Sequence, residues 1–201
     1  MRFHHAALAL AATALAAAAI TAAAPAAAQS SGKSAEGTRG FLCCNMRAYD
    51  DEIYDINYED EGARIIPFGT PVTVTRQSRN KVRLESGGKR LVLENHYSRD
   101  LSEAAFLARY VRAEDPREAA AGWPEKIREA VASARLTPGM TREQVRISLG
   151  WPVSSENPDL EAPVWRFWLS SFDEIEVEFD DDGRLIDINT SKLTRHKIWL
   201  P

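Results

Sequence analysis

The chain has 201 residues and a formal net charge of −4, with 25 lysines and arginines against 29 aspartates and glutamates. This mildly acidic balance argues against nucleic-acid binding, because contacts to phosphates need clustered basic side chains. Beyond the N-terminal segment, no apolar run approaches the ~20 residues that span a bilayer, so we expect no transmembrane helix after signal removal.

The first 28 residues read as a secretory signal peptide. Arg2 gives a basic start, an Ala- and Leu-rich stretch follows, Pro25 breaks it, and small residues precede Gln29. A retained membrane anchor is the alternative, although alanine contributes little to membrane insertion. Because the cysteines follow a polar spacer, the segment does not fit a lipoprotein signal. We expect a periplasmic protein without a lipid anchor, with association at the outer membrane left open.

The two adjacent cysteines, Cys43 and Cys44, need an explanation in an oxidising compartment. Neighbouring cysteines rarely bond each other, because the resulting ring is strained. The alternatives are two thiols on an N-terminal strand, or an intermolecular disulfide through Cys43 or Cys44. A zinc site with His96 and His196 lacks the usual spacing of structural zinc ligands. We therefore predict no metal and no cofactor.

The next part of the chain divides into a leader and a β-rich region. Residues 29–40 are polar and small, as in a flexible leader. Residues 41–97 contain short alternating segments, with Gly87-Gly88 as a hairpin signal. They predict a small β-rich domain, of which an SH3-like barrel is one form. A region this short is expected to depend on the rest of the chain.

Residues 98–135 read as a helical linker. Leu101, Ala105, Ala108 and Val111 give an apolar face that predicts a helix over 98–112. An Asp-Pro pair at 115–116 then signals a second helix start, and Gly-Trp-Pro at 122–124 interrupts it. A third helical face runs over 127–134.

Within the last segment, 136–201, one short helix is specified residue by residue. Thr141 is a candidate N-cap, and Gln144 completes a capping box with it. Met140, before the cap, and Val145 are placed to form a hydrophobic staple.

The end of this helix is equally clear. Leu149 lies one turn after Val145 on the same face. Gly150 is expected to end the helix in a left-handed conformation, and Pro152 prevents it from resuming. Three strands are predicted at about 164–170, 174–180 and 184–190.

Alternation in the middle strand predicts a sheet with one dry and one wet face, because apolar residues alternate there with glutamates. Two helices over the dry face give a two-layer α+β domain. The predicted dry face consists of Trp165, Phe167, Leu169, Ile175, Val177, Phe179, Ile186 and Ile188.

These motifs resemble the SmpA/OmlA (BamE-like) family over about residues 136–190. The resemblance implies an α+β fold with a C-terminal helix-helix-three-strand antiparallel domain, an envelope location and a binding role in outer-membrane assembly. The family's assembly member carries a lipid anchor and lacks the N-terminal β-rich region found here. The residues that carry the resemblance are Gly139, Met140, Thr141, Val145, Leu149, Gly150, Pro152, Trp165, Phe179 and Gly183.

The candidate partner-binding residues lie around the last sheet. Trp168 is expected on the wet face with Arg166 and Glu176, where an aromatic ring among charges suits a protein-binding anchor. Cross-strand packing under long charged side chains is the alternative. Trp151 is the fourth candidate.

No catalytic residues are predicted. The chain contains no H-E-x-x-H, G-x-S-x-G, P-loop or C-x-x-C motif. His96 has Glu94, Ser98 and Asp100 nearby in the sequence, which allows a triad, but a polar turn is the simpler interpretation. Residues 180–183, Asp-Asp-Asp-Gly, favour a hairpin turn over a calcium loop.

The sequence thus predicts a non-enzymatic envelope protein that binds envelope or outer-membrane proteins. A periplasmic inhibitor-like or structural partner protein is one alternative, and a periplasmic hydrolase with His96 near its site is another.

Overall fold

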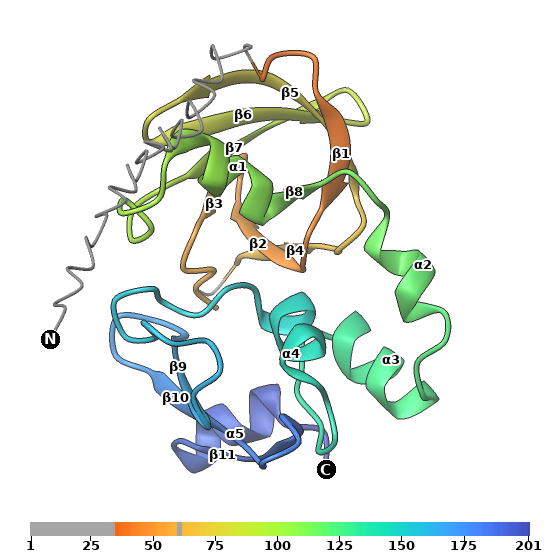
Figure 1. Ribbon diagram of the computed structural model, residues 1–201, viewed down its shortest axis with the longest axis vertical. Coiled ribbons are helices and arrows are strands. Elements are labelled where there is room, and N and C mark those ends of the chain that lie inside the picture. Colours follow the sequence, from red (N-terminus) through yellow and green to blue (C-terminus); the bar gives the residue numbers. More distant parts are fainter. Residues whose placement is uncertain (1–34, 60–61) are drawn as a thin grey trace, which may run out of the picture. The chain divides into compact units, whose positions relative to one another are not determined.

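The computed structural model describes residues 35–59 and 62–201 (Figure 1). The segment Ser34–Pro201 forms one compact unit. The predicted signal peptide, residues 1–28, lies outside the described residues, as does the first half of the predicted leader. Its last two residues, Arg39 and Gly40, already belong to the first strand.

Eight strands form the larger sheet, which curls around its own apolar core (Figure 1). Its order is β4-β2-β3-β7-β6-β5-β1-β8. All neighbours are antiparallel except β3 and β7, which are parallel. The strands are β1 (Arg39–Leu42), β2 (Met46–Tyr49), β3 (Glu52–Tyr54), β4 (Arg64–Ile66), β5 (Pro71–Ser78), β6 (Lys81–Ser86), β7 (Lys89–Glu94) and β8 (Val111–Arg112).

The linker contributes to this sheet. Helix α1 (Glu103–Tyr110) starts at the N-cap Ser102 and is followed directly by β8, which pairs with β1. The helix buries Phe106 and Tyr110 in the core of the large sheet. The predicted apolar face was wrong in part, because Ala105 and Ala108 are exposed. The large aromatic side chains, which bury more apolar area than alanine, determine the rotation of the helix.

The rest of the chain forms a second core between helices and a three-stranded sheet in the order β11-β10-β9. Helix α4 begins with the predicted capping box, and Met140 and Val145 are both fully buried. The elements are α2 (Pro116–Ala120), α3 (Glu125–Ala132), α4 (Arg142–Leu149), β9 (Val164–Trp168), β10 (Glu174–Phe179), β11 (Leu185–Asn189) and α5 (Lys192–Ile198).

Gly150 ends α4 with φ +89° and ψ −168°. The predicted left-handed helical conformation was therefore wrong in detail, because this is an extended conformation with positive φ that is essentially restricted to glycine. A Cβ atom at Gly150 would also lie 2.9 Å from the Asn57 side-chain nitrogen. Glycine is thus required at position 150 both by the backbone conformation and by the closeness of the Asn57 side chain.

The predicted fold class was wrong. A C-terminal helix-helix-three-strand BamE-like domain was expected, preceded by a small β-rich region and a helical linker. Instead, the described residues contain a curled, mixed eight-stranded sheet, a three-stranded sheet and five helices. The difference arises because β8 joins the large sheet across about 70 residues of chain and because α5 was not expected at all.

Two smaller errors concern strands. The sequence EIYDINY, residues 52–58, is one of the short alternating segments of the β-rich region, yet β3 ends at Tyr54 and Asn57 takes a positive φ. Ile186 was expected on the dry face, but it is exposed because the β10–β11 register shifts between Glu178 and Phe179. Leu185 fills the core position instead.

Two buried asparagines join the two cores. The Asn45 amide donates to the carbonyls of Val131 and Ser148 at 2.6 and 3.2 Å, and its oxygen accepts from the Phe68 N–H. The Asn57 amide donates to the Leu149 carbonyl at 2.7 Å. Because both side chains are buried, these bonds fix helices α3 and α4 against the turn between β1 and β2 and against the segment after β3.

Candidate functional site

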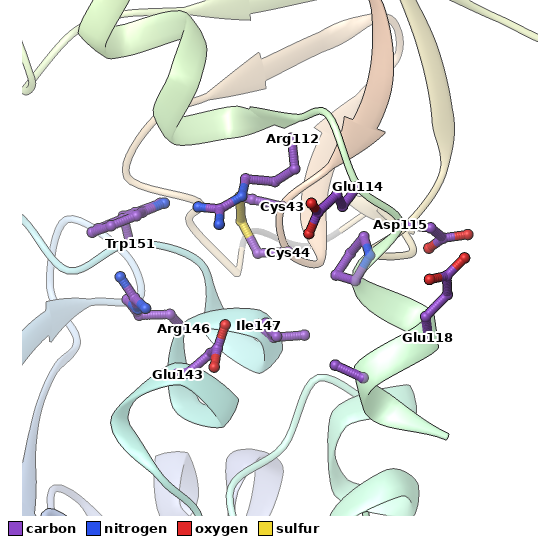
Figure 2. A pocket seen from close by; sticks show the side chains of 12 residues that line it. Cys43, Cys44, Arg112, Glu114, Asp115, Glu118, Glu143, Arg146, Ile147 and Trp151 are labelled. Atoms are coloured by element: carbon purple, nitrogen blue, oxygen red, sulfur yellow. A yellow bond between two sulfur atoms is a disulfide. The ribbon is translucent and has the colours of Figure 1, made fainter. Parts of the chain in front are cut away.

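A cavity of about 270 Å³ lies where the end of β1, the segment from β8 into α2, and helix α4 meet (Figure 2). Three stretches far apart in sequence form its wall. They contribute Cys43 and Cys44; Arg112, Glu114, Asp115, Pro116, Glu118 and Ala119; and Glu143, Arg146, Ile147 and Trp151.

A disulfide between Cys43 and Cys44 forms part of this wall. The expectation that the neighbouring cysteines do not bond each other was wrong, since neither is free. Backbone hydrogen bonds hold the segment on both sides. The Cys43 N–H donates to the Tyr110 carbonyl at 2.9 Å, and the Asn45 N–H donates to the Ile147 carbonyl at 2.8 Å. An intermolecular disulfide would first require this bond to open.

Trp151 stands between two guanidinium groups. The Arg146 guanidinium lies 4.4 Å from the indole centroid and that of Arg109 lies 4.5 Å from it. The indole N–H donates to the Arg109 carbonyl at 3.2 Å, which fixes the ring in place. A second cavity of about 160 Å³ also has Trp151 and Arg109 in its wall. Trp151 therefore lies in the wall of both cavities, with its ring held by the two guanidinium groups.

The cationic side of the cavity is not neutralised by ion pairs. Within residues 35–59 and 62–201, neither Arg112 nor Arg146 belongs to an ion pair. Burial lowers the pKa of Arg146, and the charges of Arg112 and Arg109 lower it further, against attraction to Glu143. The Arg146 Nε atom is buried without a hydrogen-bond partner. Arg112 is exposed and Arg146 partly exposed, so guanidinium N–H groups other than this Nε can meet an anion.

Three of the four carboxylates in the cavity wall lie at its other end (Figure 2). Figure 2 shows Glu114, Asp115 and Glu118 across the disulfide from Trp151 and Arg146. Asp115 is already engaged, because Arg117 donates to it at 2.9 Å and lowers its pKa. Glu143 lies beside Arg146, so the charges of the cavity are only partly separated, with both of its arginines on the side of Trp151 (Figure 2).

Trp168, Arg166 and Glu176 do share the outer face of the small sheet, as the alternation predicted. Arg166 donates to Glu176 at 2.8 Å, and to Glu156 at 3.2 Å. Trp168 is partly buried, because its ring packs edge-on against Tyr97, with 5.4 Å between the ring centroids. These three residues lie apart from the cavity, which contains Trp151 alone among the predicted partner-binding residues.

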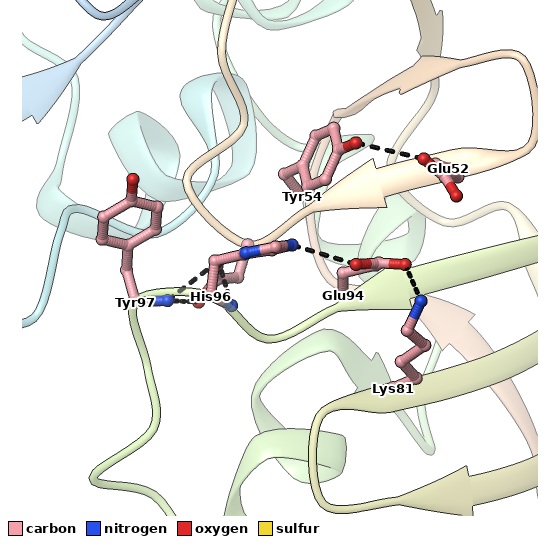
Figure 3. A network of polar contacts seen from close by, with 7 residues as sticks. Glu52, Tyr54, Lys81, Glu94, His96 and Tyr97 are labelled. Carbon is pink, nitrogen blue, oxygen red and sulfur yellow. Dashed lines mark hydrogen bonds and ion pairs between the residues drawn. The ribbon is translucent and has the colours of Figure 1, made fainter.

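His96 belongs to a polar network at the end of β7 (Figure 3). Its Nε2 lies 2.9 Å from Glu94, which also accepts a hydrogen bond from Lys81. The Ser98 hydroxyl accepts from Arg109 and has no bond to His96. The backbone N–H groups of residues 96–98 donate to the buried Asp55 carboxylate. Asp55 thus fixes a polar turn, as the simpler interpretation predicted.

Residues 180–183 form the predicted hairpin turn. Asp180 Oδ1 accepts the N–H groups of Asp182 and Arg184 at 3.0 and 2.8 Å, and Gly183 has a φ of +71°. Among the described residues, no group of three His, Cys, Asp or Glu side chains is placed to hold a metal ion.

Sequence reasoning did not find Arg112 or Arg146. Arg112 was the last residue of the helix predicted over 98–112. Arg146 lies in the helix that follows Thr141, and no function was predicted for it. Neither carries a motif, because the cavity is created only when β8 pairs with β1 and α4 packs beneath them.

Within the part of the chain that the structure describes, no helix combines the length and apolarity of a membrane span. Comparison of the chain with protein-family models, with curated proteins and with solved structures gives no match.

Proposed function

We propose that this protein is a non-enzymatic binding module of the cell envelope whose cavity receives an acidic segment of a partner protein. The observation that carries the proposal is the pair of unpaired guanidinium groups, Arg112 and Arg146, beside a fixed indole in an open cavity. The secretion signal supports the envelope setting. The sequence resemblance of residues 136–190 supports a role in outer-membrane assembly or maintenance.

The chemistry of the cavity favours carboxylate recognition. Guanidinium groups bind carboxylates through paired, charge-assisted hydrogen bonds. Buried Trp and Arg are also the residue types that most often dominate protein-binding energy. Ile147 adds apolar surface to the same wall. A short acidic and apolar peptide segment would satisfy both features.

Site-specific photo-crosslinking in intact cells tests the proposal. A photoreactive amino acid at Ala119, an exposed residue of the cavity wall, is expected to capture an envelope protein. The adduct should disappear when Arg112 and Arg146 are both replaced by alanine. It should persist in Arg90→Ala, which removes an exposed arginine of β7 remote from the cavity.

A second probe position separates the two candidate surfaces. Phe172 is 95% exposed in the turn between β9 and β10, so the photoreactive residue there reports on the end of the small sheet. Capture of the same partner from position 172 but not from position 119 would show that the partner binds at the small sheet and not in the cavity. Absence of a reproducible adduct at position 119 contradicts the proposal.

A further inference from the structure

The Cys43–Cys44 disulfide is expected to contribute little to the stability of the fold. A disulfide stabilises a fold mainly by closing a loop of chain in the unfolded state, and the effect grows with loop length. Here the bonded residues are adjacent, so no intervening chain is restrained. The segment is already held by the backbone bonds to Tyr110 and Ile147. The presence of this disulfide is therefore better explained by its reactivity than by stabilisation of the fold.

Its surroundings are those of a reactive sulfur site. Both cysteines line the cavity, while Cys43 is 8% exposed and Cys44 only 1% exposed. Cys44 Sγ lies 3.6 Å from the Met46 sulfur on its inner side. A nucleophile in the cavity therefore meets Cys43 first, and Cys44 becomes the leaving sulfur.

Cations on the same wall favour this chemistry. The reacting species in thiol–disulfide exchange is a thiolate, and neighbouring cations stabilise thiolates. Figure 2 shows the Arg112 side chain beside the disulfide on the wall that leads to Trp151. Neither arginine of the wall, Arg112 or Arg146, belongs to an ion pair among the described residues, although Glu143 attracts Arg146. The charge of Arg112, which lies beside the disulfide (Figure 2), is therefore the one most available to an incoming anion.

We infer that the Cys43–Cys44 disulfide is a thiol–disulfide exchange site that accepts a small anionic thiol in this cavity. The thiolate of the incoming molecule attacks Cys43 Sγ, a mixed disulfide forms, and the Cys43–Cys44 bond breaks to release a Cys44 thiolate. A second thiolate of the same class then attacks the sulfur of the bound thiol. It releases the Cys43 thiolate and leaves as the oxidised disulfide. Two electrons pass from two thiols to the protein, and each cysteine thiolate takes up a proton according to pH.

A charge series of small thiols tests the inference. The purified oxidised protein is treated with mercaptoacetate, 2-mercaptoethanol or cysteamine, which are anionic, neutral and cationic. Alkylation followed by intact mass gives the rate of opening of the disulfide. Each rate is divided by the rate with a small model disulfide, which removes the intrinsic reactivity of the thiol. We expect mercaptoacetate to be fastest and cysteamine slowest, by several-fold at low salt, and the difference to shrink as salt rises.

Variants assign the effect to the cavity. Replacing Arg112 and Arg146 by alanine should remove the order of the three thiols, while Arg90→Ala retains it. Cys44→Ser leaves Cys43 alone, and its thiol should then hold a mixed disulfide when treated with the oxidised form of mercaptoacetate. Circular dichroism of each variant shows that it remains folded.

Several outcomes overturn the inference. The three corrected rates can be equal, the order can survive in the arginine variant, or the disulfide can react only after the protein is unfolded by urea. These results would leave the crosslinking result at position 119 untouched. A failed crosslink likewise leaves the thiol series intact, so the two proposals fail separately.

Discussion

At the residue scale, Glu94 shows how one ion pair makes stability depend on pH. The hydrogen bond from Lys81 lowers the pKa of Glu94 most, against burial, which raises it. Because the folded pKa lies below the unfolded value of about 4.3, the pair stabilises the fold above that pH. This stabilisation is lost as the pH falls through the folded pKa.

Lys81→Met should therefore cost up to about 1 kcal/mol at pH 7. The cost should shrink in acid, where Glu94 is protonated in both proteins. Urea unfolding at pH 7 and at pH 3 measures the cost in unfolding free energy. Lys89→Met, at an exposed position of β7, is the control. A cost that stays constant down to pH 3 would show that lost packing, and not the charge, explains it.

Gly150 supports a second prediction at this scale. Gly150→Ala should destabilise the fold by about 1–3 kcal/mol through its backbone conformation, and by more through the contact with Asn57. Gly139→Ala is the matched control, because Gly139 has a φ of +85° but open space around its Cβ position. The difference between the two variants in denaturant unfolding isolates the Asn57 contact, and equal losses would show that Asn57 yields freely.

At the scale of elements, Asn45 attaches α3 and α4 to the turn after β1. Asn45→Ala would leave the Phe68 N–H and the Val131 and Ser148 carbonyls without this partner. We expect a loss of about 1–3 kcal/mol. Thermal or urea unfolding checks this against Asn80→Ala, which removes an exposed asparagine from a turn. A loss no larger than that of the control would show that water replaces these bonds.

The elements also show what the sequence makes predictable. Local chemistry was sufficient for α4, because Thr141, Gln144 and Gly150 act within one or two turns. It was also sufficient for the hairpin of β6 and β7 around Gly87 and Gly88. Strand β8 was missed because two residues after a helix gain their extended form only by pairing with β1.

The candidate site escaped prediction for the same reason. Its wall joins Cys43, Arg112 and Arg146, which nothing in the sequence places together. Trp151 was named from the local clustering of tryptophans, and its two stacked arginines became visible only in the fold. The sharpest sequence feature outside the helix motif was the cysteine pair, and its bonding was predicted wrongly.

At the scale of the whole molecule, the two cores should unfold together, because Asn45 and Asn57 connect them through buried hydrogen bonds. Three of the five tryptophans, Trp123, Trp165 and Trp199, lie in or against the second core, and Trp151 packs against the first. Fluorescence therefore reports mainly on the second core, while far-UV circular dichroism reports on both sheets. The two urea transitions are expected to coincide. In the Asn45→Ala, Asn57→Ala double variant they should separate, and separate transitions in the unmodified protein would refute the coupling.

The order of the residues along the chain bears on when the Cys43–Cys44 disulfide can form. Cys43 and Cys44 lie near the start of the described residues, whereas the segment at residues 112–119 and helix α4, which complete the wall around them, come much later. A chain that emerges N-terminus first exposes both sulfurs before the rest of the wall exists. Their first oxidant therefore needs no access to the finished cavity. After folding, only molecules small enough to enter the cavity reach the bond. The disulfide can therefore form before folding with any oxidant, but in the folded protein the size of the cavity limits which molecules can open it.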